Sequence, residues 1–388
     1  MTLSEAYCYG AKSMFQKSRK FLLLLLAVLA VGYLFYKFRN SITLEGFHWA
    51  MVGQSLRDAR LSMLVLGILG IYVCFAIRAA RWMRFSRTLG RTNFWHVYSA
   101  TLMGFTCSFL LGRAGEPIRP VLIAQKDSIP IPKMFGVYVL ERVFDMAAAA
   151  VIAGLALLVF ERNRAGSGEQ SDRIVALART GGVLLFLLLA VAISFLLYFR
   201  FHGAEWLGKR LKKPKWQHGW RGKIATLLEG FSEGLQGIRT WSDLVVLLAY
   251  TAVHWLLVLL IYVWIAHAFT GEPALVAMTL SGALVVLAFT LVGSAAQLPG
   301  VGGGAQVATF LVLTLIFGVK KEPAATASII LWLVAFAGCC FAGLPLLFIE
   351  GWSMGDLRRM ASAEEQAAEA VESEEWSKRV QNSEERPL

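Results

Sequence analysis

Long apolar runs separated by short polar segments dominate the chain. Most of these runs approach the ~20 residues that an α-helix needs to cross the ≈30 Å hydrocarbon core of a bilayer. The pattern therefore predicts an all-α, polytopic transmembrane protein. The predicted spans are 21–38, 61–77, 94–111, 134–160, 181–201, 244–269, 275–296, 305–317 and 325–349.

Composition supports a membrane protein and divides the chain into three parts. Of its 388 residues, 57% are hydrophobic and 16% are charged, whereas soluble domains carry about 25% charged residues. We expect a cytoplasmic N-terminal segment at 1–20, a transmembrane domain at 21–350 whose first span is an uncleaved anchor, and an acidic cytoplasmic tail at 351–388. The tail holds nine acids and five bases.

Basic residues indicate the orientation of the chain. Five arginines and no acid occupy 78–91, and eight bases face four acids in 202–243. Because cytoplasmic loops carry an excess of Lys and Arg, both segments are predicted to be cytoplasmic, as are both termini. The net charge of +12 is attributed to this bias, and nucleic acid is not an expected partner.

This orientation predicts that the chain turns back at 112–116, where the sequence reads GRAGE. If 94–111 simply crossed the bilayer, the eight-base loop would lie outside. The orientation is consistent if 94–111 enters from the cytoplasm and 117–133 returns to it, so that GRAGE forms the tip of a re-entrant hairpin. Irregular backbone at such depth requires burial in protein or a wet cavity.

A second break occurs at 297–304, where the sequence reads QLPGVGGG. Proline and repeated glycine disfavour a continuous helix at this point. The fold class is therefore an all-α transmembrane protein with two broken or re-entrant helical elements. Two interrupted hydrophobic elements in the two halves of a membrane chain indicate a substrate site between them.

Charged residues gather in and after the first break. Glu141, Arg142 and Asp145 lie inside the apolar run 134–160, where an ionisable side chain costs roughly 2.5–3.5 kcal/mol. Spacings of three and four residues allow ion pairs among them. They either line a path or lock helices together. Arg113, Glu116 and Arg119 bind a lipid phosphate or headgroup, or else form an interfacial loop.

Other polar residues are given structural roles. Arg78 and Arg81 are interpreted as anchors at the end of a helix. His254, within 244–269, is interpreted as a hydrogen-bonded packing residue, with proton relay as the alternative. The sequence has no CxxC or Cys/His pair at ligand spacing, so we expect no metal site and no cofactor.

Three motifs together resemble those of the lysylphosphatidylglycerol synthase transmembrane family, also called flippase-like domain proteins. They are GRxGExxRP at 112–120, ERxxD at 141–145 and the proline–glycine break at 299–304. The resemblance implies a multi-pass protein of the bacterial inner membrane that moves lipids between leaflets. It covers 21–349. The substrate-binding candidates are Arg113, Glu116, Arg119, Glu141, Arg142, Asp145, Pro299, Gly300, Gly302, Gly303 and Gln306.

The chain departs from the family pattern at the second break. Gln306 stands where the family commonly has glutamate, and Val301 replaces a glycine. A role for that acid in pairing a headgroup or carrying a proton therefore does not transfer. The acidic tail leaves no room for a soluble aminoacyl-transferase domain, so we do not expect this chain alone to make lysylphosphatidylglycerol.

The predicted function is a lipid translocase without catalytic residues, acting on a phospholipid or another phosphate-bearing lipid. Two alternatives remain open. One is a membrane-embedded transferase on a lipid phosphate, with Glu141 or Asp145 as base. The other is a non-catalytic partner of a separate lipid synthetase. The expected partners are membrane lipids, and association with a lipid-modifying enzyme or with further copies of the chain is left open.

Overall fold

The computed structural model describes residues 49–162, 240–294, 297–298 and 302–352, with single positions at 187, 191, 194, 233–234 and 237–238. The chain divides into two units, Met1–Trp49 and Ala50–Leu388, and the helices below belong to the second. The predicted spans 21–38 and 181–201 lie almost entirely outside the described residues. So do most of the loop 202–243, the residues Pro299 and Gly300, and nearly all of the acidic tail.

Helices α3 (Leu61–Ser86) and α10 (Trp241–Ala268) form an antiparallel pair. At one end the backbone N–H of Arg60 donates to the carbonyl of Ala268 over 2.8 Å. At the other end, called the basic end for its residues Arg84, Arg87 and Lys126, Arg84 contacts Asp243 at 2.7 Å. Both helices are long and apolar enough to cross a membrane, as is the segment Lys321–Ile349. The structure thus confirms an all-α polytopic membrane protein.

The first predicted break is present. Helix α4 (Phe94–Leu111) has the predicted bounds, the 3₁₀ turn η1 (Gly112–Gly115) follows, and α5 (Ile118–Lys126) runs back. The return is visible in its contacts, because Lys126 donates to Ser99 over 2.8 Å near the start of α4. We call α4, η1 and α5 the first hairpin. Its second arm has nine residues, or about 14 Å, less than half of the ≈30 Å hydrocarbon core.

The second predicted break is present as well. After the short α11 (Pro273–Val276), helix α12 (Leu280–Gly293) precedes β1 (Gln297–Leu298), which pairs antiparallel with β2 (Gly302–Gly303), and α13 (Gly304–Leu315) follows. We call α12, β1, β2 and α13 the second hairpin. Its helices have 14 and 12 residues, or about 21 and 18 Å, each too short to cross the core. The predicted span 275–296 is thus two helices, since the chain leaves helical geometry before Thr279 caps α12.

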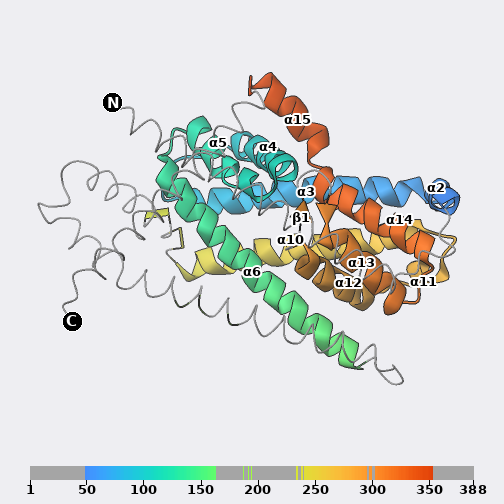
Figure 1. Ribbon diagram of the computed structural model, residues 1–388. Helices are drawn as coiled ribbons and strands as arrows, with labels where there is room; N and C mark the ends of the chain where they lie inside the picture. Colours follow the sequence, from blue (N-terminus) through green and yellow to red (C-terminus); the bar gives the residue numbers. More distant parts are fainter. Residues whose placement is uncertain are drawn as a thin grey trace, which may run out of the picture. The chain divides into compact units, whose positions relative to one another are not determined.

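The two hairpins enter the bundle from opposite ends. The first follows α3 and starts at the basic end, whereas the second follows α10 and starts at the end where Arg60 meets Ala268. They lie toward opposite ends of α3 (Figure 1). Their tips, η1 and the β1–β2 pair, therefore point toward the middle of the molecule.

Two further elements complete the walls around these tips. Helix α6 (Ile131–Arg162) starts at the basic end and runs diagonally across the bundle (Figure 1). Helices α14 (Lys321–Trp332) and α15 (Cys340–Ile349) are joined by the π-helix η4 (Leu333–Ala337). Beyond α15, Glu350 forms an ion pair with Lys126, so the chain returns to the basic end.

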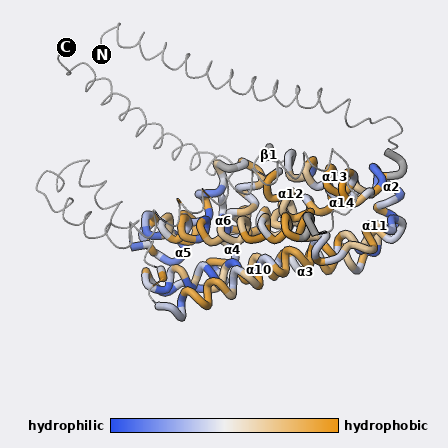
Figure 2. Tube along the Cα trace, turned by 90° about the horizontal axis from the view of Figure 1, so that it is seen from below, coloured by the Kyte–Doolittle hydropathy of each residue, from blue (hydrophilic) through white to orange (hydrophobic). Residues whose placement is uncertain are grey.

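The outer surface is that of a protein in lipid. Large apolar side chains are exposed at every fourth position of α3, at Leu61, Val65, Leu69 and Val73. Such a stripe would be costly in water and is typical of a helix that faces acyl chains. Figure 2 shows hydrophobic residues along α3 and α10, with hydrophilic residues concentrated near α5 and near α2 (Trp49–Arg57) and α11.

Candidate functional site

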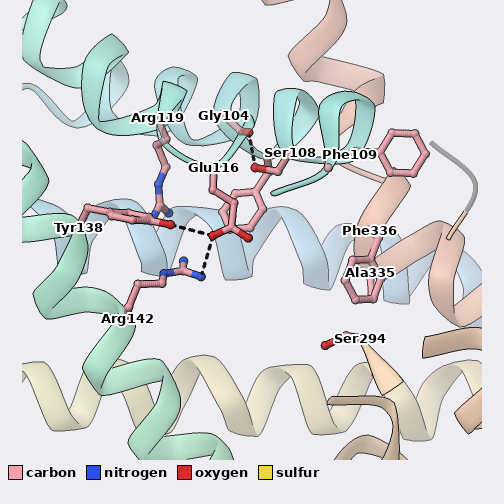
Figure 3. A pocket seen from close by; sticks show the side chains of 12 residues that line it. Gly104, Ser108, Phe109, Glu116, Arg119, Tyr138, Arg142, Ser294, Ala335 and Phe336 are labelled. Carbon is pink, nitrogen blue, oxygen red and sulfur yellow. Dashed lines mark hydrogen bonds and ion pairs between the residues drawn. The ribbon is translucent and has the colours of Figure 1, made fainter. Parts of the chain in front are cut away.

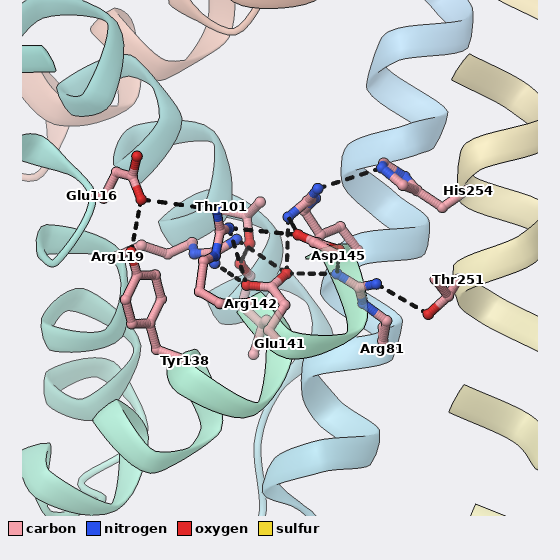
Figure 4. Close-up of polar contacts among 12 residues, drawn as sticks. Arg81, Thr101, Glu116, Arg119, Tyr138, Glu141, Arg142, Asp145, Thr251 and His254 are labelled. Carbon is pink, nitrogen blue, oxygen red and sulfur yellow. Dashed lines mark hydrogen bonds and ion pairs between the residues drawn. The ribbon is translucent and has the colours of Figure 1, made fainter. Parts of the chain in front are cut away.

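Two carboxylates of α6 lie at the centre of a buried charge cluster. Arg78 of α3 donates to Glu141 at 3.0 Å and to Asp145 at 2.9 Å. Arg81, one turn further along α3, donates to the same two carboxylates at 3.0 and 2.7 Å. Arg119 of α5 also donates to Glu141 (Figure 4). Three elements of the bundle are thus joined through one pair of acids.

The interpretation of Arg78 and Arg81 as helix-end anchors is wrong. They are only 8% and 1% exposed, and α3 continues past the predicted end at 77 to Ser86. The helix can extend because the carboxylates of α6 neutralise its arginines away from water. A signal was present in the sequence: the two arginines stand three residues apart on one helix face, and the two acids of α6 stand four apart.

Aromatic rings and a glycine fix Arg119. Its guanidinium lies 4.7 Å from the ring centroid of Trp82, 5.3 Å from that of Phe105 and 5.9 Å from that of Tyr138. A Cβ atom on Gly104 of α4 would lie 2.4 Å from the Cβ of Arg119. The glycine therefore allows the two arms of the first hairpin to approach, and the rings hold the cation by cation–π contacts.

A cavity of about 280 Å³ lies beside this cluster. Its walls come from α4, η1, the start of α5, α6, the end of α12 and the π-helix η4 (Figure 3). Both hairpins thus contribute to one space, the second through Ser294 at the end of α12, and a substrate site between the two broken elements stays a prediction. The lining residues are Gly104, Phe105, Ser108, Phe109, Gly112, Glu116, Arg119, Tyr138, Arg142, Ser294, Ala335 and Phe336.

Arg142 faces this cavity and is held differently from the other arginines. Its side chain is 35% exposed and lies 3.6 Å from Glu141, 3.6 Å from Asp145 and 3.8 Å from Glu116. All three distances exceed the usual 2.7–3.2 Å of an N–H···O hydrogen bond. Its Nε atom is buried without a hydrogen-bond partner among the described residues. Arg142 therefore has charge and donors to offer to a ligand.

Glu116, the acid among the described residues that line the cavity, is also loosely held. Its Oε2 atom accepts a hydrogen bond from the hydroxyl of Tyr138 at 2.7 Å, and its side chain is 37% exposed. Figure 3 shows its carboxylate between Tyr138 and Arg142. Among the described side chains of the site, four arginines meet three carboxylates, which leaves one positive charge in excess.

Helix α10 adds two neutral partners to the cluster. Arg81 donates to the hydroxyl of Thr251 over 3.1 Å, and Nε2 of His254 lies 3.4 Å from Arg78 (Figure 4). Both residues are buried. This placement agrees with the packing role predicted for His254.

The other predicted site residues are distributed over both tips. Arg113 belongs to η1, and Gly302 and Gly303 form β2. Gln306 accepts the backbone N–H of Gly303 and so caps α13. It is not among the residues that line the cavity.

The family model of the lysylphosphatidylglycerol synthase TM region matches residues 21–343. The match covers most of the chain, including both hairpins and the charge cluster, and the chain therefore belongs to this family. No curated protein matches the chain.

Proposed function

We propose that this member of the lysylphosphatidylglycerol synthase TM family moves a phosphate-bearing lipid between the two leaflets of a membrane. One observation carries the proposal: the two hairpins enter from opposite ends, and residues of the first hairpin together with Ser294, at the end of α12 in the second, line a single cavity with charged walls. A site reached by broken helices from both sides is the arrangement that transporters use for alternating access.

The size of the cavity favours a headgroup as its occupant. Pockets that bury drug-sized ligands have about 300–1,000 Å³, and this one has about 280 Å³. A phosphate with a small substituent fits such a volume, whereas acyl chains do not. The tails would remain in the lipid phase, against apolar outer faces such as the exposed stripe of α3.

We assign the phosphate contact to Arg142. A guanidinium offers parallel donors that match phosphate oxygens, and those of Arg142 lie beyond hydrogen-bond distance of their acids. Arg78, Arg81 and Arg119 instead donate to Glu141 or Asp145. They form a lock that holds α3, α5 and α6 around the cavity.

The transferase alternative has less support in this geometry. It requires Glu141 or Asp145 to accept a proton from a reacting group, yet each accepts hydrogen bonds from at least two arginines. A carboxylate so occupied is poorly placed as a general base. The alternative of a non-catalytic partner for a lipid synthetase assigns no role to a cavity that both hairpins line.

The proposed setting is a bacterial inner membrane, with the basic end in the cytoplasm. Arg84, Arg87 and Lys126 gather at that end of the described bundle. By the positive-inside rule and the spans predicted from the sequence, we propose that both termini are cytoplasmic. The first hairpin would enter from the cytoplasm and the second from outside.

Leaflet exchange in liposomes tests the proposal. Purified protein is reconstituted with headgroup-labelled phosphatidylglycerol, and exchange is followed by chemical quenching of the outer leaflet. We expect exchange by the wild type and at least tenfold slower exchange by Arg142→Lys, which keeps the charge but loses the parallel N–H donors of the guanidinium. The matched control is Arg87→Lys, because Arg87 is half exposed and contacts Asp243 away from the cavity.

Two outcomes would contradict the proposal. Wild-type protein that is folded in liposomes but exchanges no labelled phospholipid removes the translocase function. Full exchange by Arg142→Lys removes the assignment of the phosphate contact. New lipid species in the same vesicles would favour the transferase instead.

A further inference from the structure

We propose that Glu116 is a counter-anion built into the cavity, which occupies the phosphate position beside Arg142 until an anionic headgroup displaces it. The inference rests on the proposed function, because it assigns the displacing group to the lipid. It also gives Tyr138 a positioning role, since the Tyr138 hydroxyl donates to Glu116.

The Glu116 carboxylate stands where a ligand of Arg142 would bind. It lies in the cavity with one oxygen 2.7 Å from the Tyr138 hydroxyl and 3.8 Å from Nη1 of Arg142. Its charge and planar pair of oxygens resemble those of a phosphodiester. A lipid phosphate that enters the cavity and approaches Arg142 would meet the space that Glu116 fills (Figure 3).

This carboxylate is held weakly in comparison with Glu141. Glu141 is fully buried and accepts hydrogen bonds from three arginines. Among the described residues, Glu116 has one hydrogen bond, from the Tyr138 phenol, and one ion pair longer than a hydrogen bond, and its side chain is 37% exposed. Removing Glu141 from its partners would leave buried arginines unpaired, whereas moving Glu116 aside would uncover only Arg142, which is partly exposed and receives the phosphate in exchange.

Arg142 needs a counter-charge when the lipid is absent. A cation in a partly buried cavity is costly without a counter-charge. Glu116 supplies that charge from the first hairpin, and Tyr138 keeps it within reach of Arg142 on the same helix. On arrival of the lipid, the carboxylate stays with Tyr138 and the phosphate takes its place at Arg142.

This exchange makes Glu116 a specificity-determining residue. An incoming headgroup has to carry a negative charge to compete with a carboxylate for Arg142, so an uncharged lipid gains nothing at this position. The structure thereby assigns the site to lipids with an anionic phosphate rather than to uncharged lipids such as diacylglycerol.

Binding by the purified full-length protein tests the inference without requiring transport. The probe is dihexanoyl phosphatidylglycerol, titrated by calorimetry, with dihexanoylglycerol as the uncharged comparison. Glu116→Gln keeps the shape of the side chain and removes the competing charge, so it should bind the anionic probe about fivefold more tightly, as loss of a partly exposed ion pair implies. Arg142→Gln should bind it at least tenfold more weakly.

A double variant separates competition from an unrelated change in the cavity. If Glu116 weakens binding only by competing with the probe for Arg142, Glu116→Gln should not increase the affinity for the probe in an Arg142→Gln background. Glu116→Ala serves as a second variant and should also bind the anionic probe more tightly than the wild type. Equal or weaker binding by both single Glu116 variants, or no binding of the probe by any protein, would overturn the inference.

Failure of this inference differs from failure of the proposed function. Tighter binding by Glu116→Gln together with no leaflet exchange by the wild type would leave the counter-anion in place and remove the translocase. Leaflet exchange by the wild type with unchanged binding by the Glu116 variants would leave the translocase in place and remove the counter-anion.

Discussion

Arginine serves two purposes within a few ångströms of one another in this protein. Arg78, Arg81 and Arg119 donate to buried carboxylates and join three helical elements. Arg142 stands on the same helix as those carboxylates but faces the cavity, with 35% of its side chain exposed. Hydrogen-bond distance and exposure, rather than charge alone, therefore separate a structural cation from one that is free to bind.

The lock that Arg78, Arg81 and Arg119 form with the carboxylates of α6 should contribute to stability. Glu141→Gln removes the charge that accepts hydrogen bonds from three arginines. Breaking a buried ion pair costs about 3–5 kcal/mol, so we expect the Tm to fall by about 10 °C, with leaflet exchange per folded molecule largely retained. The control is Glu116→Gln, a substitution of the same kind at a partly exposed acid, which should leave the Tm within about 2 °C.

Thermal unfolding and exchange of both variants decide the role of Glu141. A stable and abundant Glu141→Gln protein without exchange would move this residue from the lock to the transport path. It would also favour the alternative that Glu141, Arg142 and Asp145 line a path.

At the residue scale, the sequence identified the charged residues of α6 but not the side chains of α3 that contact them. Glu141, Arg142 and Asp145 stand out because ionisable residues in an apolar run need partners. Their main partners could not be assigned, because Arg78 and Arg81 lie about 60 residues earlier, near the apparent end of a span. Only the packing of α3 against α6 brings these arginines to the acids.

At the scale of elements, the positions of helix breaks were more predictable from the sequence than the lengths of the helices. The bounds of α4 and the positions of both breaks follow from glycine, proline and the limits of an apolar run. Helix α3 is longer than its apolar run because ion pairs allow three arginines to continue it to Ser86. The π-helix η4 at Leu333–Ala337, which contributes Ala335 and Phe336 to the cavity, has no marker in the local sequence.

The second break supplies the element-scale prediction. Gly303 has φ 138°, a conformation that glycine adopts freely and a β-branched residue does not, and it precedes α13. Gly303→Val should therefore lower leaflet exchange and stability by more than Gln306→Ala. The latter removes the side chain that caps α13, a loss worth about 0.5–2 kcal/mol.

Exchange rate and Tm, measured on equal amounts of folded protein, compare the two variants. If Gly303→Val is tolerated as well as Gln306→Ala, the break is an ordinary loop and the second hairpin has no special tip. The comparison also tests Gln306 directly, since a strong loss of exchange at normal stability would give it a role beyond capping.

For the whole molecule, charge placement and the two hairpins predict one arrangement in the membrane. Lys126 and Glu350 meet at the basic end, so the first hairpin and the end of α15 face the same side. Helix α6 leaves that end and runs across the bundle (Figure 1). A chain with an even distribution of basic residues could insert either way, but Arg84, Arg87 and Lys126 favour a cytoplasmic basic end.

Single-cysteine labelling tests this arrangement in intact cells. In a variant with Cys8, Cys74, Cys107, Cys339 and Cys340 replaced, a membrane-impermeant thiol reagent should label Gly166→Cys from outside. It should reach Lys126→Cys only after the cells are opened, because a re-entrant first hairpin returns its second arm to the cytoplasm. Arg210→Cys and Glu375→Cys should behave like Lys126→Cys, since the basic loop and the tail are predicted on the same side. Labelling of residue 126 but not of 166 from outside would reverse this orientation, because Lys126 lies beside Ser99 at the start of α4 and α6 leads away from that end. The two hairpins would still enter from opposite ends, but the basic end would face outside and the assignment from the positive-inside rule would be wrong.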